Sequence, residues 1–392
     1  MNAPMVDRRR AERARLEPLL SAKEIVVTCG AGGVGKTTVA AAAAAMAATH
    51  HGGRVLALTV DPARRLANAL GLEQFGNVET RVDAAAFSAA GINPRGELWV
   101  AMLDTKASWD DLVREHAPDA KTRDAILANP LYRNITAKFV QSHDYIAMER
   151  LHEIHASGRY DLIVVDTPPT RNAIDFLDAP DRMADFFSSR LLRWLIAPYR
   201  SRLVTAASKP FYTVADRVLG AQFLQDIADF FILFQTMYDG FVERARAVTR
   251  TLEDRRTSFV VVSTLDPGPV REAEFFVDAL GARKYHVGAV VLNRTLPGYL
   301  RDRAGLEAAE AMTAGADDIA AELARRVTDR AALAGVLREV AESYRNYRIV
   351  ATREAEQRAE LTVDPGLVVT VPALESDITS LTEVLAVGQH LW

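Results

Sequence analysis

Residues 30–37 constrain the fold of this chain more than any other segment, because they match the G-x-x-x-x-G-K-T pattern of a phosphate-binding loop. A short β-branched run at 24–29 precedes the loop, and an alanine-rich stretch that ends near residue 53 follows it. We therefore expect strand, loop and helix in this order, which is the context that a phosphate loop requires. The pattern predicts a nucleotide-binding α/β fold.

The residues of the loop have distinct predicted roles. Glycines allow the backbone N–H groups to turn toward phosphate oxygens, and the helix that begins at Lys36 adds its positive N-terminus. The Lys36 ammonium is expected to contact the β- and γ-phosphates and to be catalytic, while the Thr37 hydroxyl ligates Mg²⁺. The predicted nucleotide-binding residues here are Gly30, Ala31, Gly32, Gly33, Val34, Gly35, Lys36, Thr37 and Thr38.

Apolar segments that alternate with helical patterns predict the rest of the sheet. Continuous apolar strands are typical of a parallel sheet that is buried on both faces. We therefore predict an α/β fold with a doubly wound, mostly parallel sheet and a helical insertion subdomain. The expected strands are 24–29, 54–60, 98–103, 161–166, 258–263, 286–292 and 367–371.

The domain organisation follows from the segments that lack strand signals. Residues 1–22 are predicted to be a basic N-terminal tail, and residues 23–392 a single ATPase domain of the phosphate-loop type. Helical insertions are expected at about 106–158 and 181–254. Residues 301–360, which are rich in Ala, Arg and Glu, are expected to form exposed helices against one edge.

Composition excludes several classes of function. The chain has 47 Lys and Arg against 51 Asp and Glu, so it lacks the basic field that drives non-specific nucleic-acid binding, and no nucleic-acid partner is expected. Its single cysteine, Cys29, excludes an intrachain disulfide and zinc sites built on paired thiolates. No signal peptide or membrane span is predicted, and we expect a cytoplasmic protein.

Two carboxylates that follow apolar strands are candidates for the chemistry. Asp61, in Thr59-Val60-Asp61-Pro62, would orient the attacking water, or it would only turn the chain out of the strand. Asp166 would hold Mg²⁺ through a water, or it would only cap the strand. The phosphate loop favours the functional interpretation of Asp166.

The chain resembles the arsenical pump-driving and tail-anchored-protein-targeting ATPases, the ArsA-like family. The similarity lies in GAGGVGKTT at 30–38, TVDPARRL at 59–66 and DTPPTRNAIDFLDAP at 166–180, with weaker support from VVLNR at 290–294 and VPAL at 371–374. The resemblance implies ATP and Mg²⁺ as cofactors, and a dimer that ATP switches between open and closed forms.

The resemblance also implies roles for individual residues. It assigns positioning of the water to Asp61, Mg²⁺ to Thr37 and Asp166, adenine to Asn293 and the backbone near Pro372, and nucleotide contact to Asp266. The sequence at Asn293-Arg294-Thr295-Leu296 lacks the Lys and Asp of a guanine-binding N-K-x-D motif. ATP is therefore preferred over GTP.

Two departures from the family pattern affect function. The family's usual loop has a lysine, which contacts the phosphates of a dimer partner, where this chain has Ala31. We therefore expect slow basal hydrolysis, with a cation supplied by a partner or by an arginine of this chain. With Cys29 alone, the zinc-bridging cysteines and the arsenite-binding cysteine cluster of other members are absent, which disfavours activation by arsenite.

Aromatic residues are concentrated between residues 181 and 241, which hold 12 of the 29 aromatic side chains. They either form the core of the insertion or line an exposed groove for an apolar helix. They include Phe186, Phe187, Trp194, Phe211, Phe223, Phe230, Phe231 and Phe234.

Glu149, His152 and His155 have helical spacing that would suit a metal. Solvated or capping roles are the favoured interpretation, because no second cluster of this kind follows in the sequence.

Three functions remain open from the sequence. The first is an ATP-hydrolysing dimeric switch that handles or targets hydrophobic, tail-anchored-like helices. The second is the soluble ATPase subunit of an arsenite or anion membrane pump, whose partner is a membrane protein. The third is a low-turnover ATP-dependent scaffold with a paralogous partner, which Ala31 favours. The dimer is either of like chains or with a related ATPase subunit.

Overall fold

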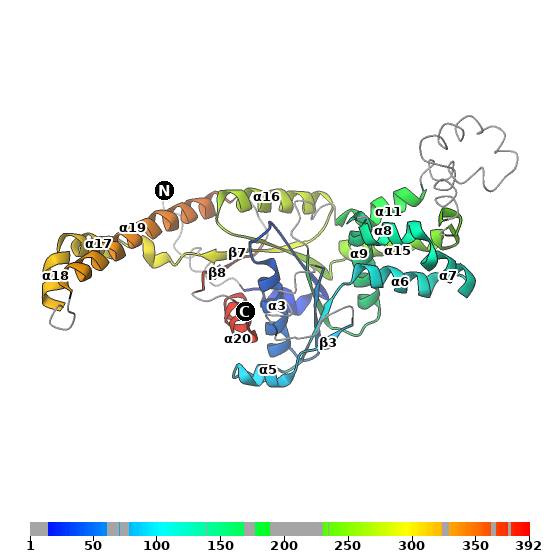
Figure 1. The fold of residues 1–392 in the computed structure, drawn as a ribbon, viewed down its shortest axis with the longest axis horizontal. Helices are drawn as coiled ribbons and strands as arrows, with labels where there is room; N and C mark the ends of the chain where they lie inside the picture. Colours follow the sequence, from blue (N-terminus) through cyan, green and yellow to red (C-terminus); the bar gives the residue numbers. More distant parts are fainter. Residues whose placement is uncertain are drawn as a thin grey trace, which may run out of the picture.

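The computed structural model contains one mostly parallel sheet with helices on both faces (Figure 1). It describes residues 15–60, 70, 78–138, 140–167, 177–188, 230–233, 235–323, 329–361, 366–374 and 378–392. The sheet has eight strands in the order β3-β4-β2-β5-β1-β6-β7-β8. The α/β class predicted from the sequence is therefore confirmed.

Seven of the strands lie where the apolar segments predict them, and β3 is a short addition at the edge. Every neighbouring pair is parallel except β3 and β4, which are antiparallel. The strands are β1 (Ile25–Cys29), β2 (Arg54–Thr59), β3 (Thr80–Arg81), β4 (Glu97–Met102), β5 (Leu162–Asp166), β6 (Thr257–Ser263), β7 (Val287–Thr295) and β8 (Val368–Pro372). A strand as short as β3 has too few residues to show an alternating pattern.

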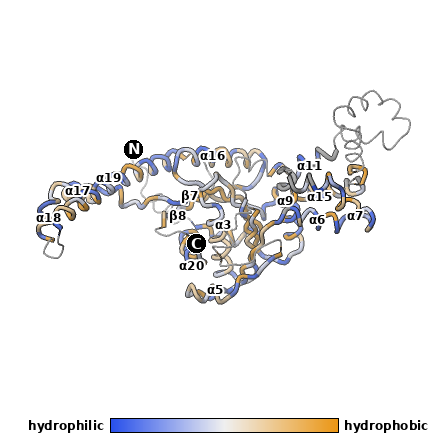
Figure 2. Tube along the Cα trace, viewed as in Figure 1, coloured by the Kyte–Doolittle hydropathy of each residue, from blue (hydrophilic) through white to orange (hydrophobic). Residues whose placement is uncertain are grey.

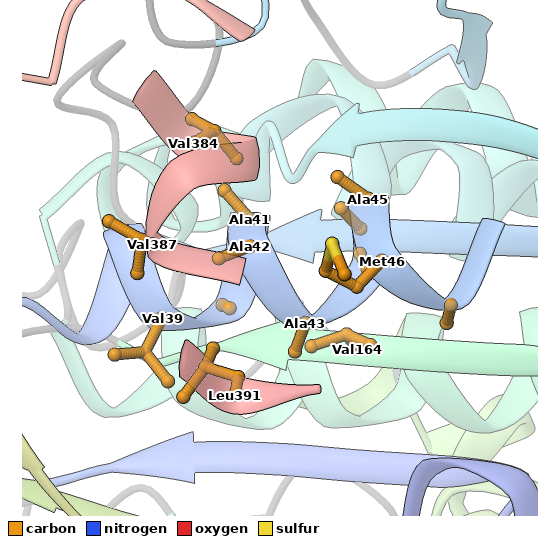
Figure 3. Close-up of a cluster of buried hydrophobic side chains, with 14 of the residues drawn as sticks. Val39, Ala41, Ala42, Ala43, Ala45, Met46, Val164, Val384, Val387 and Leu391 are labelled. Carbon is orange, nitrogen blue, oxygen red and sulfur yellow. The ribbon is translucent and has the colours of Figure 1, made fainter. Parts of the chain in front are cut away.

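One face of the sheet is covered by α3 (Lys36–His50) and α20 (Leu381–Leu391), with α2 (Glu17–Ala22) and α5 (Ala84–Ala89) beside them. Alanines of α3 lie between α20 and the sheet (Figure 3). Gly388 permits the close approach of α20, because a Cβ there would meet the side chain of Met46. Small side chains thus bring the backbone of α3 near both neighbours.

The other face is covered by α9 (Val140–Ala156), α15 (Tyr238–Glu253) and α16 (Pro267–Ala282). Their buried residues pack against Ile25, Val27 and Ile163 of the two central strands. Burial on both faces explains why these strands are continuously apolar.

The helical insertion has a core of its own. Its described elements are α6 (Thr105–His116), α7 (Ala120–Ala128), α8 (Pro130–Lys138), α9, α11 (Ala179–Ser188), the 3₁₀ helix η1 (Gln235–Met237) and α15. Trp109, Tyr145, Phe230 and Phe241 are buried together in it. Residues 189–229, which contain Trp194, Phe211 and Phe223, lie outside the described part.

Residues 298–323 and 329–360 form a helical arm that extends away from the sheet near β7 (Figure 1). The arm consists of η2 (Gly298–Arg301), α17 (Arg303–Ala314), α18 (Ala316–Leu323) and α19 (Arg330–Glu360). Its helices pack chiefly on one another rather than lying against the sheet edge. Figure 2 shows hydrophobic and hydrophilic residues mixed along the arm.

The end of the predicted N-terminal tail is part of the fold. Leu16 is buried and its backbone N–H donates to the carbonyl of Leu391 at 2.6 Å, while Leu19 and Leu20 of α2 join the core. Residues 1–14, which carry most of the basic cluster, lie outside the described part. Within the described residues, no helix has the length and apolar character needed to cross a bilayer.

Candidate nucleotide-binding site

The phosphate loop connects β1 to α3, at the carboxyl end of a central strand. Gly30, Gly33 and Gly35 have φ values of 140°, 79° and 96°, which favour glycine over residues with a side chain. A Cβ at Gly30 would meet the carbonyl oxygen of Val262, and one at Gly35 would meet the side-chain amide of Asn293. The glycine spacing of the motif thus has a direct steric cause.

Lys36 is held inside this loop. Its side chain is buried, and Nζ donates to the carbonyl oxygens of Gly30 at 3.0 Å and Ala31 at 2.8 Å. Thr37 and Thr38 occupy the first turn of α3 and are half-buried. The ammonium and the positive end of α3 therefore meet at one loop, an arrangement suited to an anion.

Asp166 ends β5, the strand next to β1, and is 1% exposed. The Thr59 hydroxyl donates to its Oδ2 at 3.1 Å, and the Thr167 hydroxyl donates to the carbonyl of Thr28 at 2.8 Å. The carboxylate is therefore fixed one strand away from the phosphate loop. Its oxygens and the hydroxyl of Thr37 are hard donors of the kind that Mg²⁺ prefers, so the residues fit this ion.

Asn293 contacts the phosphate loop from β7. It is buried, and its Nδ2 donates to the carbonyl of Val34 at 2.8 Å. Pro372 ends β8, where it is in register with Thr295 of β7. Both residues predicted to hold adenine thus lie at the carboxyl ends of neighbouring strands, as ligand-binding residues do in open α/β sheets.

Asp266 lies at the start of α16, just beyond β6. Its side chain accepts a hydrogen bond from the Thr264 hydroxyl at 2.9 Å. It belongs to the same edge of the sheet, and its nucleotide contact stays a prediction.

Asp61 lies outside the described residues. The strand that leads to it, β2, ends at Thr59, and the backbone N–H of Val60 donates to the carbonyl of Asp166 at 3.1 Å. Its role in positioning water stays a prediction from the sequence.

Arg294 contacts the phosphate loop and was not assigned a role from the sequence. Its backbone has φ 57°, and Nη1 donates to the carbonyl of Gly33 at 3.3 Å. A left-handed non-glycine residue within a strand, here one position before the end of β7, is uncommon, and sequence alone does not reveal it. This exposed guanidinium lies beside the loop in which Ala31 replaces the family lysine.

Two other sequence features have structural rather than chemical explanations. Cys29 is buried in β1, and burial raises the pKa of its thiol to about 12, which disfavours the reactive thiolate. Glu149 pairs with Arg244, His152 bonds to the Thr251 hydroxyl, and His155 bonds to Glu24. Among the described residues there is no group of three potential metal ligands.

The glycine loop, its buried lysine and the adjacent strand-end carboxylate define a phosphate-loop nucleoside triphosphatase fold. The family model described as "Anion-transporting ATPase" matches residues 23–314, and the chain belongs to this family. The expected membership is therefore confirmed.

The curated relatives that this chain matches have low sequence identity to it. A protein of Prosthecochloris vibrioformis named "Putative arsenical pump-driving ATPase" is 25% identical over 196 residues. A protein of the same name from Chlorobaculum tepidum is 24% identical over 196 residues. Each alignment covers 50% of this chain and 43% of the relative, so the match spans less than half of the relatives' length.

Proposed function

We propose that this chain binds ATP with Mg²⁺ and hydrolyses the β–γ bond. The observation that carries the proposal is the position of Lys36, whose ammonium is held by two carbonyls of the loop at the N-terminus of α3. Phosphate oxygens that entered the loop would meet the ammonium and the backbone N–H groups together. The family membership supports this activity.

The metal would be held by Thr37 directly and by Asp166 through a water. When bound, Mg²⁺ neutralises charge on the phosphates. The chain's own residues position its ligands, because Thr59 orients the Asp166 carboxylate and the helix fixes Thr37. Asp61 positions the attacking water.

We further propose that ATP controls a dimer that handles hydrophobic helices. The chain passes from Asp166 at the phosphate site to Ala179, where α11 begins, within a short stretch. Helix α11 packs against α9 and α15 in the aromatic insertion. A γ-phosphate that repositioned this stretch would thus have a covalent connection to the insertion.

A pump-driving role is the second candidate. The description of the family and the names of the two relatives favour it. Stimulation of hydrolysis by oxyanions would support this role, whereas binding of an apolar helix would support the first. A low-turnover scaffold, the third candidate, is favoured by Ala31 and would bind ATP with little hydrolysis.

The hydrolysis test compares the wild-type chain with Asp61→Asn. We expect the variant to retain ATP binding while turnover falls by about 100-fold or more, the scale for losing a positioned acid–base group. Asp278→Asn, an exposed change on α16, is the matched control and should leave turnover unchanged. Wild-type turnover in Asp61→Asn would remove Asp61 from the mechanism.

The helix-handling test measures binding of a labelled hydrophobic helix with a non-hydrolysable ATP analogue, with ADP and without nucleotide. We expect binding with the analogue only. Equal binding in all three states, or binding in none, would refute the helix-handling role and leave the pump or scaffold.

A further inference from the structure

Helix α19 carries two lengthwise rows of residues, of which one is packed and one is exposed. The packed row faces α17, α18 and η2: Ala334, Ala341 and Ala351 are buried, and Tyr344 donates to the carbonyl of Leu300 at 3.3 Å. Its members alternate in steps of three and four residues, as in a coiled-coil seam. They are Ala334, Leu337, Ala341, Tyr344, Arg348 and Ala351.

The exposed row repeats the same spacing on another side of the helix. It consists of Val336, Val340, Ser343, Tyr347 and Val350, and we call it the open seam. Its apolar members are 53%, 52%, 57% and 45% exposed, in chain order. Four large apolar side chains in one row are more than the scattered single exposures of an ordinary surface. The row therefore indicates a surface for another helix.

The charges beside the open seam select its partner. Glu339, Asn346 and Arg353 line its uncovered flank at intervals of seven residues, and all three are exposed. If a second α19 packs antiparallel, with Val340 of each copy opposite Val350 of the other, the flanking positions of the two copies also face each other. Glu339 of each copy then faces Arg353 of the other, which gives two such pairs. The two Asn346 side chains meet at the two-fold axis.

Other pairings lack this match. In a parallel dimer Glu339 would face position 344, where Tyr344 is engaged in the packed row. A membrane surface would favour a mainly basic flank, whereas this flank has both signs. The seam also has Ser343 at its centre, which suits the polar position of a helix pair better than an apolar client groove.

The two rows also have the relative angle that such an assembly needs. With roughly 100° per residue, their centres lie about a quarter turn apart around α19. In a four-helix bundle each helix contacts two neighbours at about this angle. Joining two arms through the open seam would place α19 and α17 of both copies in such a bundle.

We propose that the open seam of α19 binds a second copy of this chain in antiparallel orientation. This contact lies on the helical arm, away from the phosphate loop, so it does not depend on bound nucleotide or on hydrolysis. It goes beyond the proposed ATPase function by naming a specific self-association surface.

Disulfide formation tests the geometry directly. Since the native Cys29 is buried, a single introduced cysteine on α19 reports on its own position. Asn346→Cys should form an oxidised, covalent dimer of the full chain. Thr352→Cys, which is exposed on a different side of α19, is the matched control and should stay monomeric on denaturing gels. A disulfide-linked dimer in both cysteine variants, or in neither, would contradict the proposed orientation.

The Asn346→Cys cross-link also tests the chemistry of the seam, because it reports on this contact whatever dimer forms at the nucleotide site. Adding Lys36→Ala should leave the cross-link unchanged, and adding Val340→Glu should abolish it with the helix content retained. Adding Arg353→Glu should reduce the cross-link, and Glu339→Arg combined with Arg353→Glu should restore it. A cross-link that survives Val340→Glu would overturn the proposal. So would an Asn346→Cys chain that does not cross-link but binds anionic phospholipid vesicles through Val340, since the seam would then be a lipid-binding surface.

Discussion

The sheet and the helical insertion bury their interiors with different chemistry. The sheet's core consists mainly of valines, leucines, isoleucines and the alanines of α3, with only a few aromatic side chains such as Phe87 and Phe259. The insertion instead packs Trp109, Tyr145 and Phe241 against one another, with tilted rings whose centroids lie 5.9–6.0 Å apart. It also buries Glu149 with Arg244 and with the Tyr145 hydroxyl.

Because of this difference, packing in the sheet region determines the position of the phosphate loop, and packing in the insertion determines how easily that region is destabilised. Close packing of α3 fixes the phosphate loop through many small contacts, each of minor importance. The insertion depends on a few large rings and one buried ion pair, each of which carries a large part of its stability. Changes in the first region should therefore alter activity, and changes in the second should alter stability.

The largest effect is expected from Lys36→Ala. Removing the ammonium from the loop should abolish measurable hydrolysis and strongly weaken ATP binding, because it is the side-chain cation predicted to contact the β- and γ-phosphates. ATP binding and turnover are measured beside Lys121→Ala, an exposed lysine of α7. Full ATP binding by Lys36→Ala would show that the loop is not the nucleotide site.

Phe230→Ala should affect stability rather than the phosphate loop. Phe230 is 4% exposed and lies 5.1 Å from Phe231, ring to ring. Its truncation should lower the free energy of unfolding by ~3–5 kcal/mol, the range for a buried phenylalanine. Phe275→Ala on α16, where the side chain is 58% exposed, is the control and should cost under about 0.5 kcal/mol. Equal melting temperatures for the two variants would place Phe230 outside a core.

Arg244→Met should lower the free energy of unfolding by an amount that depends on pH. Without the cation the buried Glu149 carboxylate is uncompensated, and the loss at neutral pH should be about 3 kcal/mol, the low end for a buried pair because Arg244 is 20% exposed. Burial raises the pKa of Glu149, and Arg244 lowers it. The loss should therefore shrink as pH falls through the raised pKa, because protonation removes the uncompensated charge.

The wild-type chain sets the baseline for that experiment. Its folded state keeps Glu149 protonated up to a higher pH than the unfolded chain does, because the pKa of Glu149 is raised on folding. The contribution of Glu149 to stability is therefore present at low pH and is lost as pH rises through the raised pKa. Arg246→Met, on the exposed side of α15, is the matched control. A loss in Arg244→Met that is constant with pH would mean that Glu149 does not titrate in this range.

The smallest effect is expected from Arg294→Ala. If this guanidinium supplies the cation that Ala31 lacks, turnover should fall by about 10-fold, the scale of one charge-assisted hydrogen bond. Arg303→Ala, at a 90% exposed arginine of the arm, should leave turnover unchanged. Unchanged turnover in Arg294→Ala would mean that another arginine of this chain or a partner supplies the missing cation.

Sequence patterns were sufficient for most of the sheet, because its strands are buried on both faces and their apolar runs are uninterrupted. They did not reveal β3, which is too short to have a period. Nor did they indicate that the arm extends from the sheet, since the exposed helices expected there would have the same composition in either position. That arrangement follows from tertiary packing, since α19 contacts α17, α18 and η2.

The phosphate site was predictable in part for a similar reason. Its glycines are constrained by the backbone, and such constraints are visible as a motif. The contact between Arg294 and Gly33 depends on a left-handed residue at a strand end, which no local pattern specifies. Asp61 shows the opposite case, in which the sequence supplies an expectation for a residue that the structure does not describe.

The packing of α20 against α3 has a consequence for synthesis of the protein. The alanine face of α3 forms early in translation, yet the residues that cover it, such as Val384 and Leu391, emerge on the order of 340 residues later. At typical ribosomal speeds this delay is on the order of 20–70 s. Until then the helix that follows the phosphate loop lacks one of its two packing neighbours. The nascent chain should therefore acquire its mature nucleotide affinity only after residues 381–391 have left the ribosome, and chaperones that shield apolar surface would have that interval in which to act.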